Sequence, residues 1–183
     1  MSAAVSEGEQ VKLLIKTVDF AAKKHAAQRR KDAEKTPYIN HPVGVANILA
    51  NEGGVSDVTV LQAALLHDTV EDTDTSYEEL VAYFGETVAN IVMEETDDKT
   101  LPKAERKQKQ VERIEKMSRE AKMVKLADKL YNLRDLNRAT PEGWSEERVG
   151  EYFKWAKSVT GQIQGVNQAL ELELNKVYDA RNV

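Results

Sequence analysis

A histidine and an aspartate stand side by side at the end of an apolar stretch, in the octapeptide LLHDTVED at residues 65–72. On a helix that turns about 100° per residue, His67 lies above Glu71. Asp68 lies above Asp72 in the same way, so four titratable groups share one sector. Three carboxylates so close together repel one another, and burying them unpaired costs free energy. The pattern favours a divalent cation that offsets this repulsion, and a solvated acidic helix end is the alternative.

A second histidine, His41, stands directly before Pro42 in the segment TPYINHP at residues 36–42. Pro42 disfavours helical backbone at the preceding residue and suits the first turn of a helix that follows. We therefore expect His41 at the start of a helix, with the restricted freedom that a metal ligand needs. A purely structural histidine at a helix N-terminus is the alternative.

A carboxylate flanked by apolar residues, Asp128, stands in the segment 121–135. Four residues of this segment recur at helical spacing and predict a buried stripe: Val124, Ala127, Leu130 and Tyr131. Asp128 and Asn132 are four residues apart and share a polar line beside that stripe. Asp128 is therefore a further candidate ligand, and a surface carboxylate paired with Lys125 or Lys129 is the alternative.

These segments together offer two histidines and two carboxylates, and the predicted ligands of one ion are His41, His67, Asp68 and Asp128. Mixed nitrogen and oxygen ligation, with positions left for water, suits Mn²⁺ or Fe²⁺ better than a closed structural zinc site. The chain contains no cysteine, which excludes disulfides, thiolate chemistry and cysteine-type zinc sites. We expect a single ion, with manganese favoured and iron as the alternative.

The order of these segments carries a resemblance to a known family. The chain resembles the HD-domain metal-dependent phosphohydrolases in three places: Asn40-His41-Pro42, then His67-Asp68 with Glu71-Asp72, then LADKLYNLR at residues 126–134. It is similar to the (p)ppGpp hydrolase branch, the SpoT/Rel hydrolase domain, and within it to the small hydrolase-only metazoan SpoT homologues. The similarity runs from about residue 18 to about residue 167. It implies an all-α HD fold, a compact bundle of roughly eight to ten helices.

The resemblance also implies an activity, the hydrolysis of the 3′-pyrophosphate of the alarmone (p)ppGpp to give GDP or GTP and pyrophosphate. The cation would activate a water and polarise a phosphoryl oxygen. Glu71 and Asp72, outside the ligand set, would orient that water and accept its proton. Crowding with Asp68 should raise the pKa of one of these two carboxyl groups.

Cationic and polar residues near these segments are the expected substrate contacts, because phosphates are anionic. By resemblance, Arg30 and Lys31 contact the nucleotide, with Tyr38 nearby, and a solvated basic face is the alternative. Lys99, in the loop at residues 96–102, is a further expected contact. Asn132 is another, because its amide can both donate and accept hydrogen bonds to a sugar or a base.

Other conspicuous residues are assigned to structural roles. His25 lies beside Lys24 on the first expected helix, and we place it away from the metal. Trp144 and Trp155 are interpreted as packing residues. The basic residues at positions 103–109 are interleaved with glutamate and predict an ordinary exposed helix face.

Length and composition agree with one globular domain over residues 1–183. The chain has 41% hydrophobic and 31% charged residues, the proportions of a folded protein rather than a disordered one. It lacks a long apolar run and a signal-peptide pattern, so we expect a cytoplasmic protein without membrane association. The formal charge of −5 argues against nucleic-acid binding. The sequence leaves the oligomeric state open.

Apolar periodicity and capping residues predict helix after helix and no strand. The expected helices cover about 9–27, 42–52, 57–70, 75–85, 86–96, 103–116, the Asp128 segment up to Thr140-Pro141, a helix from Ser145, and 168–180.

Two other functions stay open at this stage. The first is another substrate for the same chemistry, the 2′-phosphate of NADPH or a different nucleotide of an HD phosphohydrolase. The second is a non-catalytic nucleotide-binding module. The complete ligand set and the retained Glu71-Asp72 pair favour an enzyme.

Overall fold

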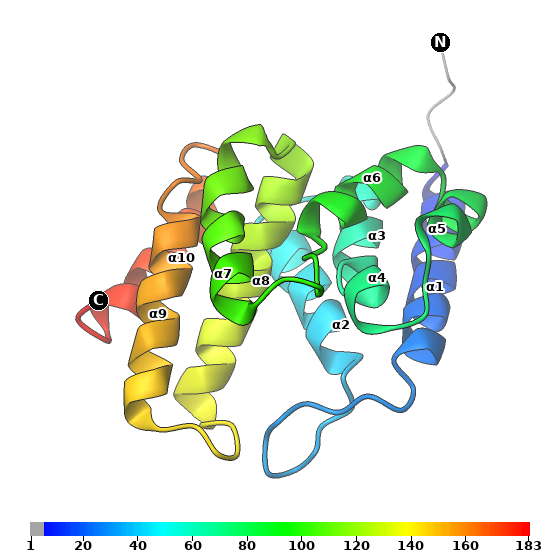
Figure 1. Cartoon of the computed structure of the whole chain (residues 1–183). Helices are drawn as coiled ribbons and strands as arrows, with labels where there is room; N and C mark the ends of the chain where they lie inside the picture. Colours follow the sequence, from blue (N-terminus) through cyan, green and yellow to red (C-terminus); the bar gives the residue numbers. More distant parts are fainter. Residues whose placement is uncertain (1–5) are drawn as a thin grey trace.

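The computed structural model describes residues 6–183, and over that range the chain forms helices joined by turns and loops (Figure 1). The α-helices are α1 Glu7–Lys24, α2 Asn40–Asn47, α3 Val58–Leu66, α4 Thr69–Asp72, α5 Tyr77–Phe84, α6 Glu86–Glu95, α7 Lys103–Arg113, α8 Arg119–Arg138, α9 Glu146–Thr160 and α10 Gln168–Asp179. A π-helical turn, Ile48–Glu52, extends α2, and a 3₁₀ turn, Ile114–Lys116, extends α7. The all-α prediction is confirmed.

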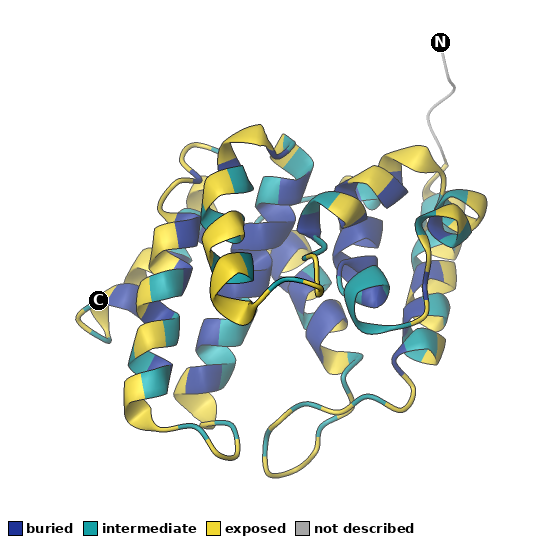
Figure 2. Cartoon of the chain, viewed as in Figure 1, coloured by how far each residue is buried: buried dark blue, intermediate teal, exposed yellow. Residues whose placement is uncertain are grey.

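Two helices, α3 and α8, form the centre of the fold. Every residue of α3 from Val60 to Leu66 is buried, and the helix packs against α1, α2, α6 and α8. Helix α8 packs against α2, α3, α6, α9 and α10. In Figure 1, α1 and α3–α6 lie on one side of α8, and α7, α9 and α10 lie on the other. Figure 2 shows the buried residues concentrated on the central helices, while α7 is largely exposed. Because α3 is buried on all sides over these residues, it is stabilised mainly by burial of its apolar side chains.

The histidine–aspartate pair lies at a break between two helices rather than on one continuous helix. Helix α3 ends at Leu66, His67 and Asp68 form a turn, and α4 begins at Thr69. Two side chains bond to carbonyl oxygens that a continuing helix would use: His67 Nδ1 lies 2.8 Å from Ala64 O, and Thr69 Oγ1 donates to Leu66 O at 2.7 Å. Side-chain bonds of this kind compete with the helical ladder. The prediction of a single helix over 57–70 is therefore wrong at His67 and Asp68, which form a turn.

His41 lies in the first turn of α2, which begins two residues earlier than the expected start at residue 42. The helix starts at Asn40, so His41 is helical although Pro42 follows it. The first N–H groups of a helix have no partner within it, so a proline here removes no hydrogen bond. At its other end, the helical segment stops where predicted, before Gly53 and Gly54, and Gly54 has a positive φ of 63°.

Candidate metal centre and active site

Three segments far apart in the sequence bring histidine and carboxylate groups together in the middle of the fold. His41 comes from α2, His67 from the turn after α3, and Asp128 from the middle of α8; each is buried, and their ligand atoms all lie within 4.8 Å of one another. His41 Nε2 lies 3.2 Å from Asp128 Oδ1. Asp68 Oδ2 lies 3.4 Å from His41 Nε2 and 3.2 Å from His67 Nε2. The four predicted ligands therefore converge.

A hydrogen bond to a backbone carbonyl orients the His67 ring as a metal ligand would need. Its Nδ1 faces the carbonyl oxygen of Ala64 at 2.8 Å, and a carbonyl can only accept, so Nδ1 carries the proton. The other nitrogen, Nε2, is buried and has no hydrogen-bond partner within residues 6–183. An imidazole whose Nδ1–H is held by a backbone carbonyl presents the lone pair of Nε2 to a metal.

The carboxylates of the cluster favour positive charge beside them. Although burial opposes a charge on it, His67 has a pKa well above the usual value because the Asp68 and Asp128 carboxylates lie against it. Burial also opposes charge on both aspartates, but His67 lowers the pKa of Asp68 well below its usual range, and Lys129 does the same for Asp128. A divalent cation would displace the histidine proton, since a ligand must bind the metal in its deprotonated form.

Asp128 is a buried carboxylate held by its own helix rather than a surface charge. Its Oδ2 accepts a hydrogen bond from Lys129 Nζ at 2.9 Å, and its Oδ1 accepts one from Asn132 Nδ2 at 2.6 Å. Lys129 is buried as well, and its ammonium lies 4.6 Å from the centre of the Trp155 ring. Asp128 is paired with Lys129, as the alternative interpretation expected, but the pair is buried and orients a candidate metal ligand inside the protein.

The Glu71-Asp72 pair faces two neighbouring cavities, which share the lining residues Arg30, Tyr38 and Asn132. Glu71 lines a polar cavity of about 160 Å³ together with the four predicted ligands, and its Oε2 accepts a hydrogen bond from the backbone N–H of Asp97 at 3.0 Å. Burial raises the pKa of Glu71, with Asp97, Asp68 and Asp72 contributing, as the crowding argument predicts for one member of the pair. Asp72 lines a neighbouring cavity of about 400 Å³. The two carboxylates are therefore suited to different tasks.

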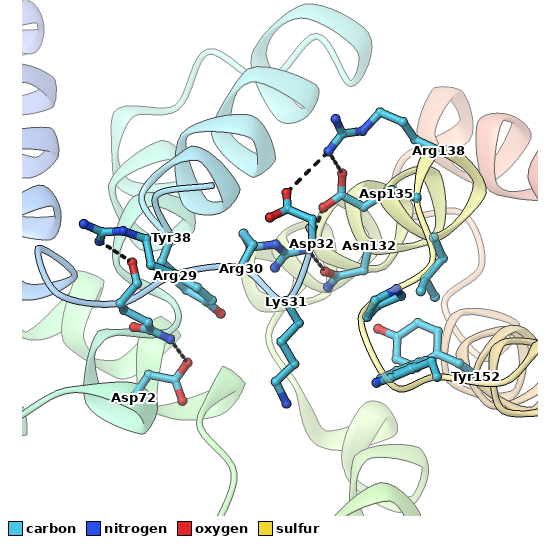
Figure 3. Close-up of a pocket in the computed structure, with 15 residues that line it drawn as sticks. Arg29, Arg30, Lys31, Asp32, Tyr38, Asp72, Asn132, Asp135, Arg138 and Tyr152 are labelled. Atoms are coloured by element: carbon cyan, nitrogen blue, oxygen red, sulfur yellow. Dashed lines mark hydrogen bonds and ion pairs between the residues drawn. The ribbon is translucent and has the colours of Figure 1, made fainter. Parts of the chain in front are cut away.

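Four of the predicted substrate contacts line the second cavity: Lys31, and a wall formed by Arg30, Tyr38 and Asn132 (Figure 3). The Arg30 guanidinium lies between the rings of Tyr38 and Tyr131, at 5.7 and 5.6 Å from their centres. It donates to Asn132 Oδ1 and to Asp135 Oδ2, each at 2.9 Å. Tyr38 donates its hydroxyl proton to a predicted metal ligand, Asp68, at 2.7 Å. These side chains are already engaged with the protein, so they form a rigid wall.

The ammonium groups of Lys31 and Lys99 differ in whether a carboxylate lies against them. Lys31 is exposed, and its side chain extends into the open space of the cavity (Figure 3); its ammonium has no carboxylate partner in the part of the chain that the structure describes. Lys99 is half-exposed, and its ammonium lies 2.5 Å from Asp72 Oδ1. Lys31 is therefore available for a phosphate, whereas Lys99 holds Asp72.

A third hollow, of about 570 Å³, adjoins the second and was not predicted. Its lining residues include Lys31, Lys103, Arg106, Lys107, Trp144, Arg148, Tyr152 and Trp155. The Lys107 ammonium lies 4.6 Å from the centre of the Trp155 ring, and burial together with the nearby Lys103 ammonium lowers the pKa of Lys107. Helix α7 has no buried residue, as expected of an exposed face, but Arg106 and Lys107 are partly buried where they line this hollow. One signal was available: Arg148, Tyr152 and Trp155 have the spacing of one helix face.

The residues present fit a divalent cation. Two buried histidines and at least one buried carboxylate converge, one imidazole has its tautomer set for ligation, and the carboxylates favour positive charge beside them. None of the helices over residues 6–183 combines the length and the apolar character needed to cross a membrane.

The family model described as HD domain matches residues 17–151, which is most of the chain. The chain therefore belongs to the HD-domain family, and a divalent metal is implied by that fold together with the His–His–Asp group.

Relatives and a solved structure agree with this assignment over almost the full length. The chain is 62% identical over 171 residues to the zebrafish (Danio rerio) protein named guanosine-3′,5′-bis(diphosphate) 3′-pyrophosphohydrolase MESH1, covering 93% of this chain and 95% of the relative. It is 60% identical over 176 residues to the human protein of the same name, covering 96% and 98%. A solved structure described as a metazoan ortholog of SpoT that hydrolyzes ppGpp superposes with a TM-score of 0.91 at 47% identity, covering 98% of both chains. The resemblance stated from the sequence is confirmed.

Proposed function

We propose that this protein hydrolyses the 3′-pyrophosphate of ppGpp and pppGpp, giving GDP or GTP and pyrophosphate. One observation carries the proposal: the ligand atoms of His41, His67 and Asp128 converge within 4.8 Å in a chain 62% identical to a zebrafish protein named for this reaction. The whole of residues 1–183 is proposed to act as one HD hydrolase domain, in the cytoplasm.

The proposed cofactor is one Mn²⁺ ion, with Fe²⁺ as the alternative, because the donor set mixes imidazole nitrogen with carboxylate oxygen. The residues that would hold it are His41, His67, Asp68 and Asp128. When bound, the ion would supply Lewis-acid activation of a water and of a phosphoryl oxygen.

The carboxylates of the cavity would carry the proton chemistry. Glu71 faces the predicted ligands, and its raised pKa brings it closer to neutrality, where a general base is most effective. It would take one proton from the attacking water as the water oxygen bonds to the phosphorus attached to the ribose 3′-oxygen. The bond from that phosphorus to the 3′-oxygen breaks, pyrophosphate leaves, and the 3′-oxygen takes the proton that Glu71 accepted from the water. Asp72, which lines the second cavity, would orient the water and the leaving oxygen.

The neighbouring hollows supply complementary charge for a nucleotide with phosphates at two positions. Arg30, Tyr38 and Asn132 would line the nucleoside, and Lys31 would meet a phosphate. The second phosphate group would lie against the cations that line the third hollow, among them Lys107 and Arg148. Burial and the nearby Lys103 ammonium lower the pKa of Lys107, and the Arg148 guanidinium lies 4.1 Å from the centre of the Trp144 ring. Lys99 would act through Asp72 rather than on the substrate.

NADPH is the alternative substrate, because it also carries a phosphate ester on a ribose and a diphosphate some distance away. The second and third hollows share the lining residues Lys31, Trp144 and Tyr152, and this adjacency favours a ligand of that length.

The test is pyrophosphate release from ppGpp by protein stripped with a chelator and reloaded with Mn²⁺, alongside NADPH and a deoxynucleoside triphosphate. We expect turnover of ppGpp to return with Mn²⁺, and His67→Ala and Asp128→Asn to lose both bound metal and at least about 100-fold in kcat. Asp19→Asn, which removes an exposed carboxylate paired with Lys23, is the matched control and should keep both. Full activity in either cluster variant or in the chelated protein contradicts the proposal, and nucleotide binding without turnover in Mn²⁺ would indicate a binding module.

A further inference from the structure

His25 is buried but lies outside the metal cluster. It caps the C-terminal end of α1, is 2% exposed, and packs its ring on that of Tyr38, with 4.9 Å between the ring centres. Its Nε2 is buried and has no hydrogen-bond partner among the described residues. The other ring nitrogen, Nδ1, lies 2.7 Å from Gln28 Oε1. This second contact leads from His25 towards the active site.

The hydrogen bonds from Asp72 back to His25 have only one consistent direction. A carboxylate accepts hydrogen bonds, so the amide nitrogen of Gln28 must face Asp72 Oδ2, to which it donates at 2.9 Å. The amide oxygen of Gln28 therefore faces His25. Because that oxygen can only accept, His25 Nδ1 must carry a proton and donate it. A proton on His25 Nδ1 is thus the partner that this orientation of the Gln28 amide requires.

The side chain of Gln28 is not needed to hold its own loop. Its backbone N–H donates to His25 O at 3.0 Å, and its backbone oxygen accepts from Tyr38 N at 3.1 Å. Main-chain bonds therefore fix this position, and the amide group is directed at Asp72. Lys99 holds the other oxygen of the same carboxylate, Oδ1, from the loop after α6. Two segments thus fix both oxygens of Asp72, and each oxygen keeps a lone pair for water or substrate.

We propose that Gln28, oriented by His25, is a positioning residue for hydrolysis: it holds the Asp72 carboxylate in the orientation that the reaction uses. This inference rests on the proposed function of Asp72. With the amide turned over, its oxygen would face the carboxylate and repel it, so the His25 proton selects the productive arrangement.

The first arm of the test measures steady-state ppGpp hydrolysis with Mn²⁺ for Gln28→Leu and His25→Phe. Gln28→Leu should lower kcat by on the order of 10-fold to 100-fold while KM changes less than about 2-fold, because orientation rather than binding is lost. His25→Phe keeps a ring against Tyr38 and removes only the donor, so it should lower kcat less, in the same direction. Gln62→Leu is the matched control: it removes a buried glutamine amide, bonded to Thr17 Oγ1 at 2.9 Å, and should leave kcat unchanged.

The second arm is a double-mutant cycle with Asp72→Ala. The effect of Gln28→Leu should vanish when Asp72 is already absent, since both substitutions act on one group. A kcat for Gln28→Leu and His25→Phe equal to that of the wild type, or an equal loss in Gln62→Leu, overturns the proposal. Wild-type turnover by Asp72→Ala overturns it as well, while leaving ppGpp hydrolysis itself standing.

The third arm separates this inference from the proposed function by a measurement without turnover. The Nδ1 proton of His25 should give a slowly exchanging NMR resonance in the wild type and lose that protection in Gln28→Leu. A His25 resonance that is unprotected, or protonated on Nε2 alone, contradicts the hydrogen-bond chain whether or not ppGpp is hydrolysed.

Discussion

The ion pair between Lys125 and Glu95 offers a sharp test of how this fold holds charge in its interior. Lys125 Nζ lies 2.7 Å from Glu95 Oε2, and the two side chains are 3% and 1% exposed. Both line the polar cavity beside the predicted metal ligands. Burial raises the pKa of Glu95 above its ordinary 4.5, and the Lys125 ammonium opposes that rise. The perturbation is Lys125→Met, which keeps the length of the side chain and removes the charge.

The expected cost follows from leaving one charge buried alone. Removing one partner of a buried ion pair costs about 3–5 kcal/mol. For a chain of this size each kcal/mol lowers Tm by roughly 2–4 °C, which gives a fall of roughly 6–20 °C at pH 7. Without Lys125, the pKa of Glu95 rises further. A carboxyl whose pKa is higher when folded than when unfolded loses stability as pH increases, so the deficit should grow above the ordinary glutamate pKa and shrink on acidification.

The assay is urea or thermal unfolding of the wild type and Lys125→Met between pH 4 and pH 8. Lys12→Met, which removes an exposed ion pair with Glu9, should change the free energy of unfolding by less than about 1 kcal/mol. The double substitution of Lys125→Met with Glu95→Leu should recover much of the loss, because no buried charge is then left unpaired. A deficit below about 1 kcal/mol at pH 7, or one that increases towards acid, would refute the reasoning.

Three further substitutions have expected outcomes. Gly44→Ala should lower the free energy of unfolding by about 1–3 kcal/mol, because a Cβ at this position would lie 2.0 Å from the Tyr131 ring; an unchanged urea midpoint would contradict this. Tyr38→Phe removes the hydroxyl that donates to Asp68, so calorimetry should show Mn²⁺ binding weakened by about 10-fold, and equal affinity would count against a ligand role for Asp68. Arg113→Gln removes three hydrogen bonds to residues 95–97, so amide exchange in the loop at 96–102 should accelerate and kcat should fall; unchanged exchange would show that another group holds the loop.

The helices could be predicted because their signals are local. Ser145 and Asn167 cap the N-termini of α9 and α10 through hydrogen bonds to the third following N–H, as their side chains predict. Helix α5 begins at Tyr77, where Ser76 caps it, rather than at the expected residue 75. The break at the histidine–aspartate pair was not predictable from periodicity, since it depends on the His67 ring bonding a carbonyl of the preceding turn.

The candidate metal ligands could be predicted because their residue types, histidine and aspartate, are the ones that bind metal ions. Histidine and aspartate in three segments were expected to converge, and the structure brings them together. The third hollow was not expected, because it exists only where α7 and α9 pack side by side and Lys107 meets the Trp155 ring. Arg30 was expected to contact the nucleotide, and only its position between two tyrosine rings shows that it forms part of the cavity wall.

The placement of the predicted ligands on α2, on the turn after α3 and on α8 means that no fragment of the chain holds the centre by itself. An ion that binds only the folded protein stabilises the folded state against unfolding, by about 2.7 kcal/mol at a free ion concentration one hundred times Kd. The supply of metal would therefore govern the amount of folded protein as well as its rate of catalysis. Cells short of the ion would be expected to degrade this protein sooner, and its abundance would follow the metal before any change in gene expression.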